Sequence, residues 1–155
     1  MNFRCEKITD KGVIDLAQII GTQFPNLIHF SLDLYDCAKV TDVSVKVVAK
    51  EVARLRGLRR FELNLRQCYK VTGEAIRALS NELRNLENLE ELILNFRLCN
   101  KIRDAEIEEL AREIQLNLKN LHTLKLNVNY CKISKKVIEA LQISFEYLKH
   151  FELMF

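Results

Sequence analysis

Hydrophobic and polar positions alternate along this chain with two different periods. The stretch 27–37 reads L-I-H-F-S-L-D-L-Y-D-C, and apolar side chains occupy every second position across its middle. That period of two is typical of a strand with one buried face. In the stretch that follows, Val45, Val48, Val52 and Leu55 are three or four residues apart, which is the spacing of one apolar stripe on a helix. The pattern predicts a strand followed by a helix.

The same pattern returns three more times along the chain. The run that begins at Leu27, L-I-H-F-S-L-D-L-Y-D-C-A-K-V-T-D, is repeated from Leu58, Leu89 and Leu121, with steps of 31, 31 and 32 residues. A single copy cannot bury both its strand face and its helical stripe, so the copies must stack on one another. We therefore predict an α/β solenoid with a parallel sheet on its concave face and helices on its convex face.

The repeats account for nearly the whole chain, and we expect one domain over residues 1–155. Residues 1–26 are a partial repeat, in which Cys5 and Thr9 correspond to Cys37 and Thr41. Full repeats begin at about residues 27, 58, 89 and 121, and residues 148–155 are expected to form a terminal strand.

Hydroxyl side chains stand where most of the expected helices begin. Thr41, Thr72 and Ser134 occupy this place in three repeats, and each can accept a hydrogen bond from a free backbone N–H at the start of the helix. Arg103 interrupts this series, but Asp104 follows it. We expect Asp104 to cap that helix instead.

The repeated pattern L-x-x-F-x-L-x-L-x-x-C-x-K-V-T-D resembles a leucine-rich repeat. A unit of about 31 residues with a full helix looks like the ribonuclease-inhibitor-like and cysteine-containing classes. The extra L-x-L before the cysteine is similar to repeats found in ciliate proteins. The resemblance extends from about Cys5 to Phe155 and implies a leucine-rich-repeat solenoid with the shape of a curved horseshoe. It also implies a protein-binding role, in a eukaryotic cell and most simply a protist.

Alternate residues of each expected strand point away from the core, onto the concave face. Tyrosine and arginine, which are common anchors of protein interfaces, recur at these positions. The alternative is a solvated face of mixed charge without a partner. The residues that we expect to bind protein are Tyr35, Asp33, Arg60, Glu62, Asn64, Arg66, Asn95, Arg97, Lys125 and Asn127.

The last expected strand, F-E-L-M-F, ends the repeat pattern without a helix after it. It would present an open strand edge and the apolar residues Phe151, Leu153 and Phe155, and exposed edges of this kind pair with other chains. We expect another chain, or further repeats of a longer protein, to cover this end. Both alternatives stay open.

The five cysteines follow the repeat, at positions 5, 37, 68, 99 and 131. An odd number in register with the repeat does not indicate a disulfide framework, and unpaired thiols favour a reducing, intracellular location. The spacing also lacks the closely spaced pairs that zinc sites use. We expect buried thiols that donate weak hydrogen bonds to loop carbonyl groups.

Composition and charge narrow the class of function further. The chain has 24 basic and 21 acidic residues, with a net charge of +3, which is too mild to indicate nucleic-acid binding by itself. There is no apolar run of membrane-spanning length and no glycine-rich phosphate loop or metalloprotease motif. We expect no cofactor, no metal, no catalytic residues and no small-molecule substrate.

The sequence therefore predicts a non-enzymatic, protein-binding scaffold or adaptor in the cytoplasm, with a cytoskeletal or ciliary assembly as one setting. Two alternatives stay open. One is a regulator of an enzyme, of the GTPase-activating or inhibitor type, because ribonuclease-inhibitor-like repeats also build such proteins. The other is the substrate-receptor part of a ubiquitin ligase, where cysteine-containing repeats occur.

Overall fold

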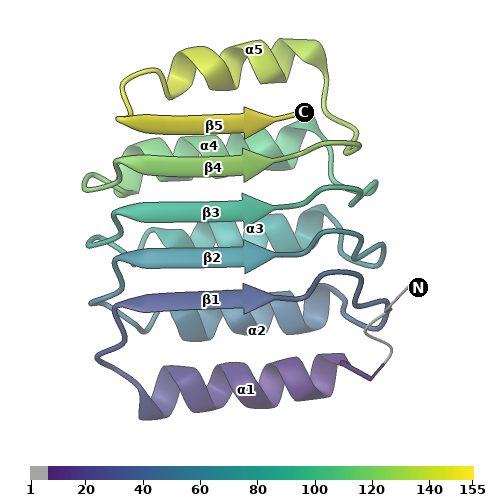
Figure 1. The fold of residues 1–155 in the computed structure, drawn as a ribbon, viewed down its shortest axis with the longest axis vertical. Coiled ribbons are helices and arrows are strands. Elements are labelled where there is room, and N and C mark those ends of the chain that lie inside the picture. The colour runs from purple at the N-terminus through teal and green to yellow at the C-terminus, as the bar shows by residue number, and fades with distance from the viewer. Residues whose placement is uncertain (1–6) are drawn as a thin grey trace.

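The computed structural model describes residues 7–155, in which helices and strands alternate strictly (Figure 1). The helices are α1 (Asp10–Gln23), α2 (Asp42–Val52), α3 (Gly73–Leu83), α4 (Asp104–Asn117) and α5 (Lys135–Ser144). The strands are β1 (His29–Asp33), β2 (Arg60–Asn64), β3 (Glu91–Asn95), β4 (Thr123–Asn127) and β5 (His150–Met154).

The strands form one parallel sheet in the order β1-β2-β3-β4-β5. Each strand pairs with its neighbour in sequence, so equivalent residues of successive repeats face one another, as Phe30, Phe61 and Leu92 do. The helices lie on the other side of the sheet (Figure 1). The predicted architecture, a parallel sheet with a row of helices behind it, is confirmed.

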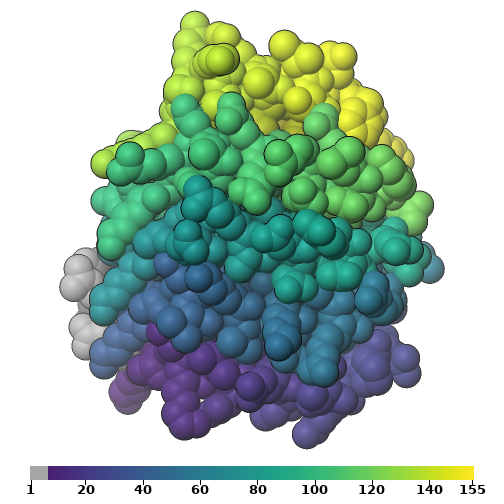
Figure 2. All heavy atoms as spheres, turned by 180° about the vertical axis from the view of Figure 1, so that it is seen from behind, coloured from purple at the N-terminus to yellow at the C-terminus, as the bar shows by residue number. Residues whose placement is uncertain are grey.

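The core lies between the sheet and the helices and runs through all the repeats. The apolar residues of the repeat pattern, such as Leu63, Leu94 and Ile107, are almost fully buried in it. Phe30 and Phe61 stack with their ring centroids 6.1 Å apart and their planes nearly parallel. Seen from behind, successive repeats form bands from the N-terminal to the C-terminal end (Figure 2). Each repeat thus buries its apolar residues against the repeats on either side.

No helix in residues 7–155 combines the length and the apolar character that are needed to cross a bilayer.

Hydroxyl caps begin three of the helices, as predicted. Thr41 Oγ1 accepts a hydrogen bond from the N–H of Val43 at 3.2 Å, and Thr72 Oγ1 accepts one from Glu74 at 3.2 Å. Ser134 Oγ accepts a longer bond from Val137 at 3.4 Å. Each cap satisfies one of the backbone donors that a helix start leaves without an intrahelical partner.

An aspartate at the first position of a helix bonds the next repeat. Asp10 accepts hydrogen bonds from the Thr41 N–H at 2.8 Å and the Thr41 hydroxyl at 2.7 Å. Asp42 accepts the same two bonds from Thr72, both at 2.7 Å. These carboxylates join one helix start to the next, so they hold the register of neighbouring helices.

Asp104 belongs to this series, and its predicted role as the cap of its own helix was wrong. Its carboxylate accepts the N–H of Ser134 in the following repeat at 2.7 Å. The N-cap position of α4 is Arg103, whose side chain makes no capping hydrogen bond. Instead, Glu106 accepts the N–H of Arg103 at 3.1 Å. The prediction failed because the carboxylate at this position points toward the next repeat.

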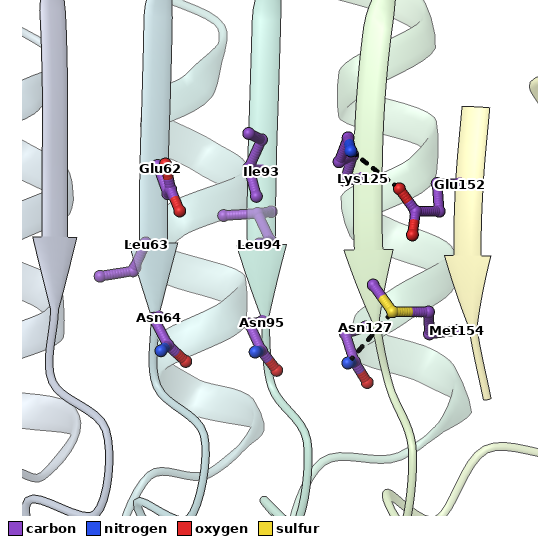
Figure 3. Close-up of a pocket in the computed structure, with 10 residues that line it drawn as sticks. All are labelled: Glu62, Leu63, Asn64, Ile93, Leu94, Asn95, Lys125, Asn127, Glu152 and Met154. Atoms are coloured by element: carbon purple, nitrogen blue, oxygen red, sulfur yellow. Dashed lines mark hydrogen bonds and ion pairs between the residues drawn. The ribbon is translucent and has the colours of Figure 1, made fainter. Parts of the chain in front are cut away.

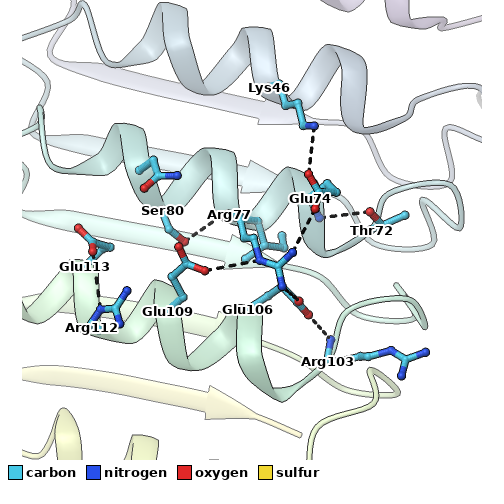
Figure 4. A network of polar contacts seen from close by, with 12 residues as sticks. Lys46, Thr72, Glu74, Arg77, Ser80, Arg103, Glu106, Glu109, Arg112 and Glu113 are labelled. Carbon is cyan, nitrogen blue, oxygen red and sulfur yellow. Dashed lines mark hydrogen bonds and ion pairs between the residues drawn. The ribbon is translucent and has the colours of Figure 1, made fainter.

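Glu106 does for the start of α4 what Asp10, Asp42 and Asp104 do for the helix starts that follow them. The first residue of α3 is Gly73, which has no carboxylate to offer Arg103. Glu106 fills the space beside this glycine, where an added Cβ would lie 2.5 Å from Glu106 Cγ. The carboxylate also pairs with Arg77 at 2.7 Å (Figure 4). The absence of a side chain at Gly73 therefore makes room for the Glu106 carboxylate that bonds Arg103.

We predict that Gly73→Ala lowers the free energy of unfolding by about 1–3 kcal/mol, because the new methyl group overlaps a buried side chain that is held by two polar contacts. Chemical denaturation followed by circular dichroism measures this loss. Adding Glu106→Ala should recover part of it, although Glu106→Ala is itself destabilising. The matched control is Gly12→Ala, because an added Cβ there meets no heavy atom within 4 Å. Additive effects of the two changes would contradict the proposed fit.

We also predict that the bond between Asp10 and Thr41 weakens in acid. Burial by itself raises the pKa of Asp10, but the hydrogen bonds from Ser44 and Thr41 outweigh it and lower the pKa below 3.8. A carboxyl group with a lowered pKa in the folded state stabilises the fold above its unfolded pKa and loses that effect as the pH falls through the folded value.

The stability gap between the wild type and Asp10→Asn should therefore be constant above pH ~4 and should shrink below it. Urea denaturation at several pH values tests this. Asp15→Asn removes an exposed carboxylate of the same helix that pairs with Lys11, and exposed pairs contribute little. For that control we expect almost no gap at any pH. A gap for Asp10→Asn that is unchanged in acid would contradict the prediction.

Candidate protein-binding face

The outward side chains of the strands form one continuous surface, which we call the strand face. Its middle is hollowed between β2 and β5 into a shallow depression with a volume of about 240 Å³ (Figure 3). Charged, polar and apolar side chains share its lining, which consists of Glu62, Leu63, Asn64, Ile93, Leu94, Asn95, Lys125, Asn127, Glu152 and Met154. Glu62, Asn64, Asn95, Lys125 and Asn127 of this lining are among the residues predicted to bind protein.

The charged residues of the strand face pair mainly with one another. Arg60 bonds Glu91 on the next strand at 2.5 Å and lies 3.3 Å from Glu62. Lys125 bonds Glu152 at 2.9 Å. Half-exposed pairs of this kind contribute about 0–1 kcal/mol to stability, so they are free to exchange partners. Both basic side chains at outward strand positions are thus paired, and the acidic ones, Asp33, Glu62, Glu91 and Glu152, leave the face with a small acidic excess.

Ile93 is the apolar centre of the depression. In the sheet it lies between Glu62 on β2 and Lys125 on β4, and it is half-buried. Ile93 was not among the binding residues predicted from sequence, although the sequence holds a signal for it. It is an apolar residue at an outward position of the strand alternation, where its counterparts in other strands are charged or polar.

The column formed by Asp33, Asn64, Asn95 and Asn127 has a structural role. Each side chain accepts, through Oδ1, the backbone N–H of the residue two positions later. These bonds measure 2.9 Å at Tyr35, 3.1 Å at Arg66, 3.1 Å at Arg97 and 3.1 Å at Asn129. Such bonds are how aspartate and asparagine stabilise a tight turn. The sequence predicted these four residues as binding residues, and their Oδ1 atoms are already occupied.

The side-chain amides of Asn64 and Asn127 each make one further contact with a neighbouring strand. Asn64 Nδ2 donates to Asp33 Oδ1 at 2.9 Å, and Asn127 Nδ2 contacts Met154 Sδ at 3.5 Å. Asn127 is only 7% exposed. All three asparagines line the depression, but a partner would find more of Asn64 and Asn95, which are half-buried, than of Asn127.

After each of these turns the chain adopts a left-handed conformation. The residues before Cys37, Cys68, Cys99 and Cys131 have a positive φ, which is 54° at Asp36, 63° at Gln67, 66° at Leu98 and 61° at Tyr130. This conformation costs a non-glycine residue about 1–3 kcal/mol. The backbone N–H groups of Asp36, Gln67 and Leu98 each donate to a carbonyl of the next repeat at 2.9 Å. The stacking of repeats thus offsets the local cost.

Arg66 and Arg97 lie beside tyrosine rings. The guanidinium carbon of Arg66 is 4.9 Å from the centre of the Tyr35 ring, and that of Arg97 is 5.3 Å from the centre of the Tyr130 ring. Tyr130 was not predicted as a site residue and is 66% exposed. Each pair holds a flat cation against an aromatic face, which fixes the arginine in place at the end of its strand.

The cysteine thiols donate to loop carbonyl groups, as expected from sequence, and three of them reach the preceding repeat. Cys68, Cys99 and Cys131 donate to the carbonyls of Leu34, Leu65 and Phe96, each at 3.1 Å. Cys5 lies outside the described residues.

Burial raises the pKa of Cys99 and raises that of Cys131 to about 11. Within residues 7–155, histidine, cysteine, aspartate and glutamate side chains form no cluster of three or more that could hold a metal ion. The bonds from Cys68, Cys99 and Cys131 to the preceding repeat join the stacked loops.

The residues predicted for an end interface differ in exposure. Phe151 and Leu153 are half-buried, and the Phe151 ring packs against Phe145 with centroids 5.3 Å apart. Phe155 is 63% exposed. The interface at this end stays a prediction.

No protein-family model matches this sequence, and no curated protein sequence matches it. Solved structures do share its fold. The chain is similar to a leiomodin-1 structure described as actin-binding site 2, with a TM-score of 0.69 and 11% identity over 91% of this chain and 78% of that one. It is also similar to the tropomodulin C-terminal domain of Caenorhabditis elegans, with a TM-score of 0.66 and 11% identity over 96% and 84% of the two chains.

These likenesses confirm the predicted fold class, a leucine-rich-repeat-like solenoid, and at 11% identity they show the fold alone. The closer resemblance to ribonuclease-inhibitor-like and ciliate repeats stays a prediction.

We predict that the described thiols react slowly in the folded protein. With a pKa raised from 9.0 to about 11, Cys131 should react with a thiolate-specific reagent ~100-fold more slowly at pH 8 than free cysteine, because the thiolate is the reactive form. Labelling followed by peptide mass spectrometry separates each site from Cys5. Cys131, the less buried of the two, should be labelled before Cys99, and both should react at once in urea. Faster labelling of Cys99 would contradict this order.

Proposed function

We propose that this chain is a protein-binding scaffold and that its partner binds to the strand face around Ile93. The observation that carries the proposal is this half-buried apolar residue at the centre of a depression, between Glu62 and Lys125. Protein interfaces commonly have an apolar centre within a polar rim that excludes water. The strand face has that arrangement, and Met154 enlarges its apolar centre.

The size of the depression favours a protein over a small molecule. Small-molecule sites are clefts of about 300–1,000 Å³ that enclose most of the ligand, whereas this hollow has about 240 Å³ and lies on an open sheet. A protein partner needs only shallow relief spread over a wide face. A non-enzymatic role, in the cytoplasm and within a larger assembly, is part of this proposal.

Actin is the first partner to test. A leiomodin-1 structure of the same fold is described as an actin-binding site, and a cytoskeletal setting would suit a scaffold. The support is a shared fold, so we propose actin as a probe of the strand face and not as its only possible partner. The roles as an enzyme regulator or as a ubiquitin-ligase receptor stay predictions.

We predict that Ile93→Lys weakens partner binding by tenfold or more, about 1.4 kcal/mol, because it places a charge where an apolar group would be desolvated. Co-sedimentation with filamentous actin tests the named probe. Affinity purification with quantitative mass spectrometry compares the partners of the two forms in a wider search.

Val43→Lys is the matched control, since it places the same charge on an exposed valine of α2, away from the strand face. Both variants should unfold at nearly the wild-type temperature. An unchanged partner set for a folded Ile93→Lys protein would remove the strand face from the proposal.

A further inference from the structure

The loops that follow β1 to β4 form a basic edge of the molecule. We call these loops, residues 34–41, 65–72, 96–103 and 128–134, the basic rim. In Figure 1 they lie on the side to which the strand arrows point. The rim contains seven basic side chains and one acidic side chain, Asp36. The whole chain has 24 basic and 21 acidic residues, so 17 basic and 20 acidic residues lie outside the rim. The excess positive charge of the chain is therefore concentrated in the rim.

Four lysines of the rim are aligned by the repeat itself. Lys39, Lys70, Lys101 and Lys132 follow one another at steps of 31 residues, and all four are exposed. Backbone bonds join the loops that carry them, as when the Lys132 N–H donates to the Ile102 carbonyl at 3.1 Å. Neighbouring parallel strands lie ~4.8 Å apart, so four lysines stacked in this way form a row ~15 Å long.

The basic side chains of the rim have no anionic partner within residues 7–155. The 14 ion pairs among the described residues all lie outside the rim. The Nε atoms of Arg66 and Arg97 are moreover buried without a hydrogen-bond partner. A buried N–H donor without an acceptor costs free energy, because it has lost its hydrogen bonds to water. A ligand that offers an acceptor can remove this cost. On the strand face both basic side chains, Arg60 and Lys125, pair with carboxylates, whereas the basic side chains of the rim have no ion pair among the described residues.

The carboxylates nearest the rim are already engaged. Asp42 and Asp104, at the first positions of their helices, accept bonds of 2.7 Å from the backbone N–H groups of Thr72 and Ser134. The helices α2 to α5 begin directly after the rim loops, so the positive ends of their dipoles add to the field at this edge.

We propose that the basic rim binds an acidic helical segment of a partner protein. One turn of an α-helix rises 5.4 Å, which is close to the step of the lysine row. Glutamates or aspartates three and four residues apart would therefore face successive lysines over about three turns. Tyr35, Tyr69 and Tyr130 stand in the rim beside Arg66 and Arg97, and tyrosine and arginine are both enriched at protein interfaces.

Nucleic acid fits the rim less well than an acidic helix. The row of lysines is short, and carboxylates flank it. Asp33 precedes the rim, Asp36 lies within it, and Glu74 follows it on α3. A long polyanion that continued past the four loops would meet these charges. The rim is a second surface, distinct from the strand face around Ile93, so each can be tested without the other.

Fluorescence anisotropy with labelled peptides tests the proposal on the full chain. The first probe is a helical peptide whose glutamates repeat every three or four residues. The second has the same composition with its glutamates scrambled, and the third is an oligonucleotide of equal charge. We expect the ordered helix to bind more tightly than both. The variant Lys70→Glu combined with Lys101→Glu should weaken that binding by tenfold or more, about 1.4 kcal/mol.

The matched control combines Lys50→Glu with Lys149→Glu, which reverses two exposed lysines outside the rim. It should bind the ordered peptide as the wild type does, and so should Ile93→Lys. An equal loss in the rim variant and the control would show general charge attraction and overturn the proposal. Tighter binding of the oligonucleotide would assign the rim to nucleic acid instead, and no binding of any probe would also overturn it.

Discussion

Each repeat of this chain depends on its neighbour for the hydrogen bonds of its strand, its loop and its helix start. The strands pair in parallel, the thiol of Cys99 donates to the carbonyl of Leu65 in the preceding repeat, and Asp42 accepts two bonds from Thr72 in the following one. An isolated repeat would leave these groups unpaired, and unpaired buried groups are costly. Stability is therefore shared between repeats, and a change in one of them is felt by the next.

The repeat at α4 shows how this shared bonding tolerates variation. The chain places Gly73 where α1, α2 and α4 begin with an aspartate, and it loses a carboxylate that would receive the N–H of Arg103. Glu106 supplies that carboxylate from the opposite direction, and the missing side chain of the glycine leaves room for it. The contact is thus preserved by a different pair of residues. This explains why a sequence pattern that breaks at Arg103 still gives a helix in register with its neighbours.

Periodicity predicted the fold because burial acts on every repeat alike. It could not predict the role of Asn64 or Asn95, since a strand position that faces outward looks the same in sequence whether its side chain meets a partner or bonds its own backbone. The hydrogen bond that Asn64 Oδ1 accepts from the Arg66 N–H depends on the turn that follows. In that turn Gln67 is left-handed, and the sequence has no glycine there to indicate it. Ile93 was missed although the alternation marks it as an apolar residue at an outward position, because its place at the centre of a depression depends on neighbours across the sheet.

The same bonding separates the residues that hold the fold from those that are free to bind. Outward positions on the strands pair across the sheet, as Lys125 does with Glu152, so a partner there must exchange existing contacts. The loops differ, because their backbone groups and thiols hold the repeats together while their lysines take no part. A side chain that the stacking does not use can vary without harm to the fold. The positive charge of Lys70 and Lys101 therefore makes no contact that holds the fold together within the described residues. Electrostatic attraction to the proposed anionic partner is the role that it fits.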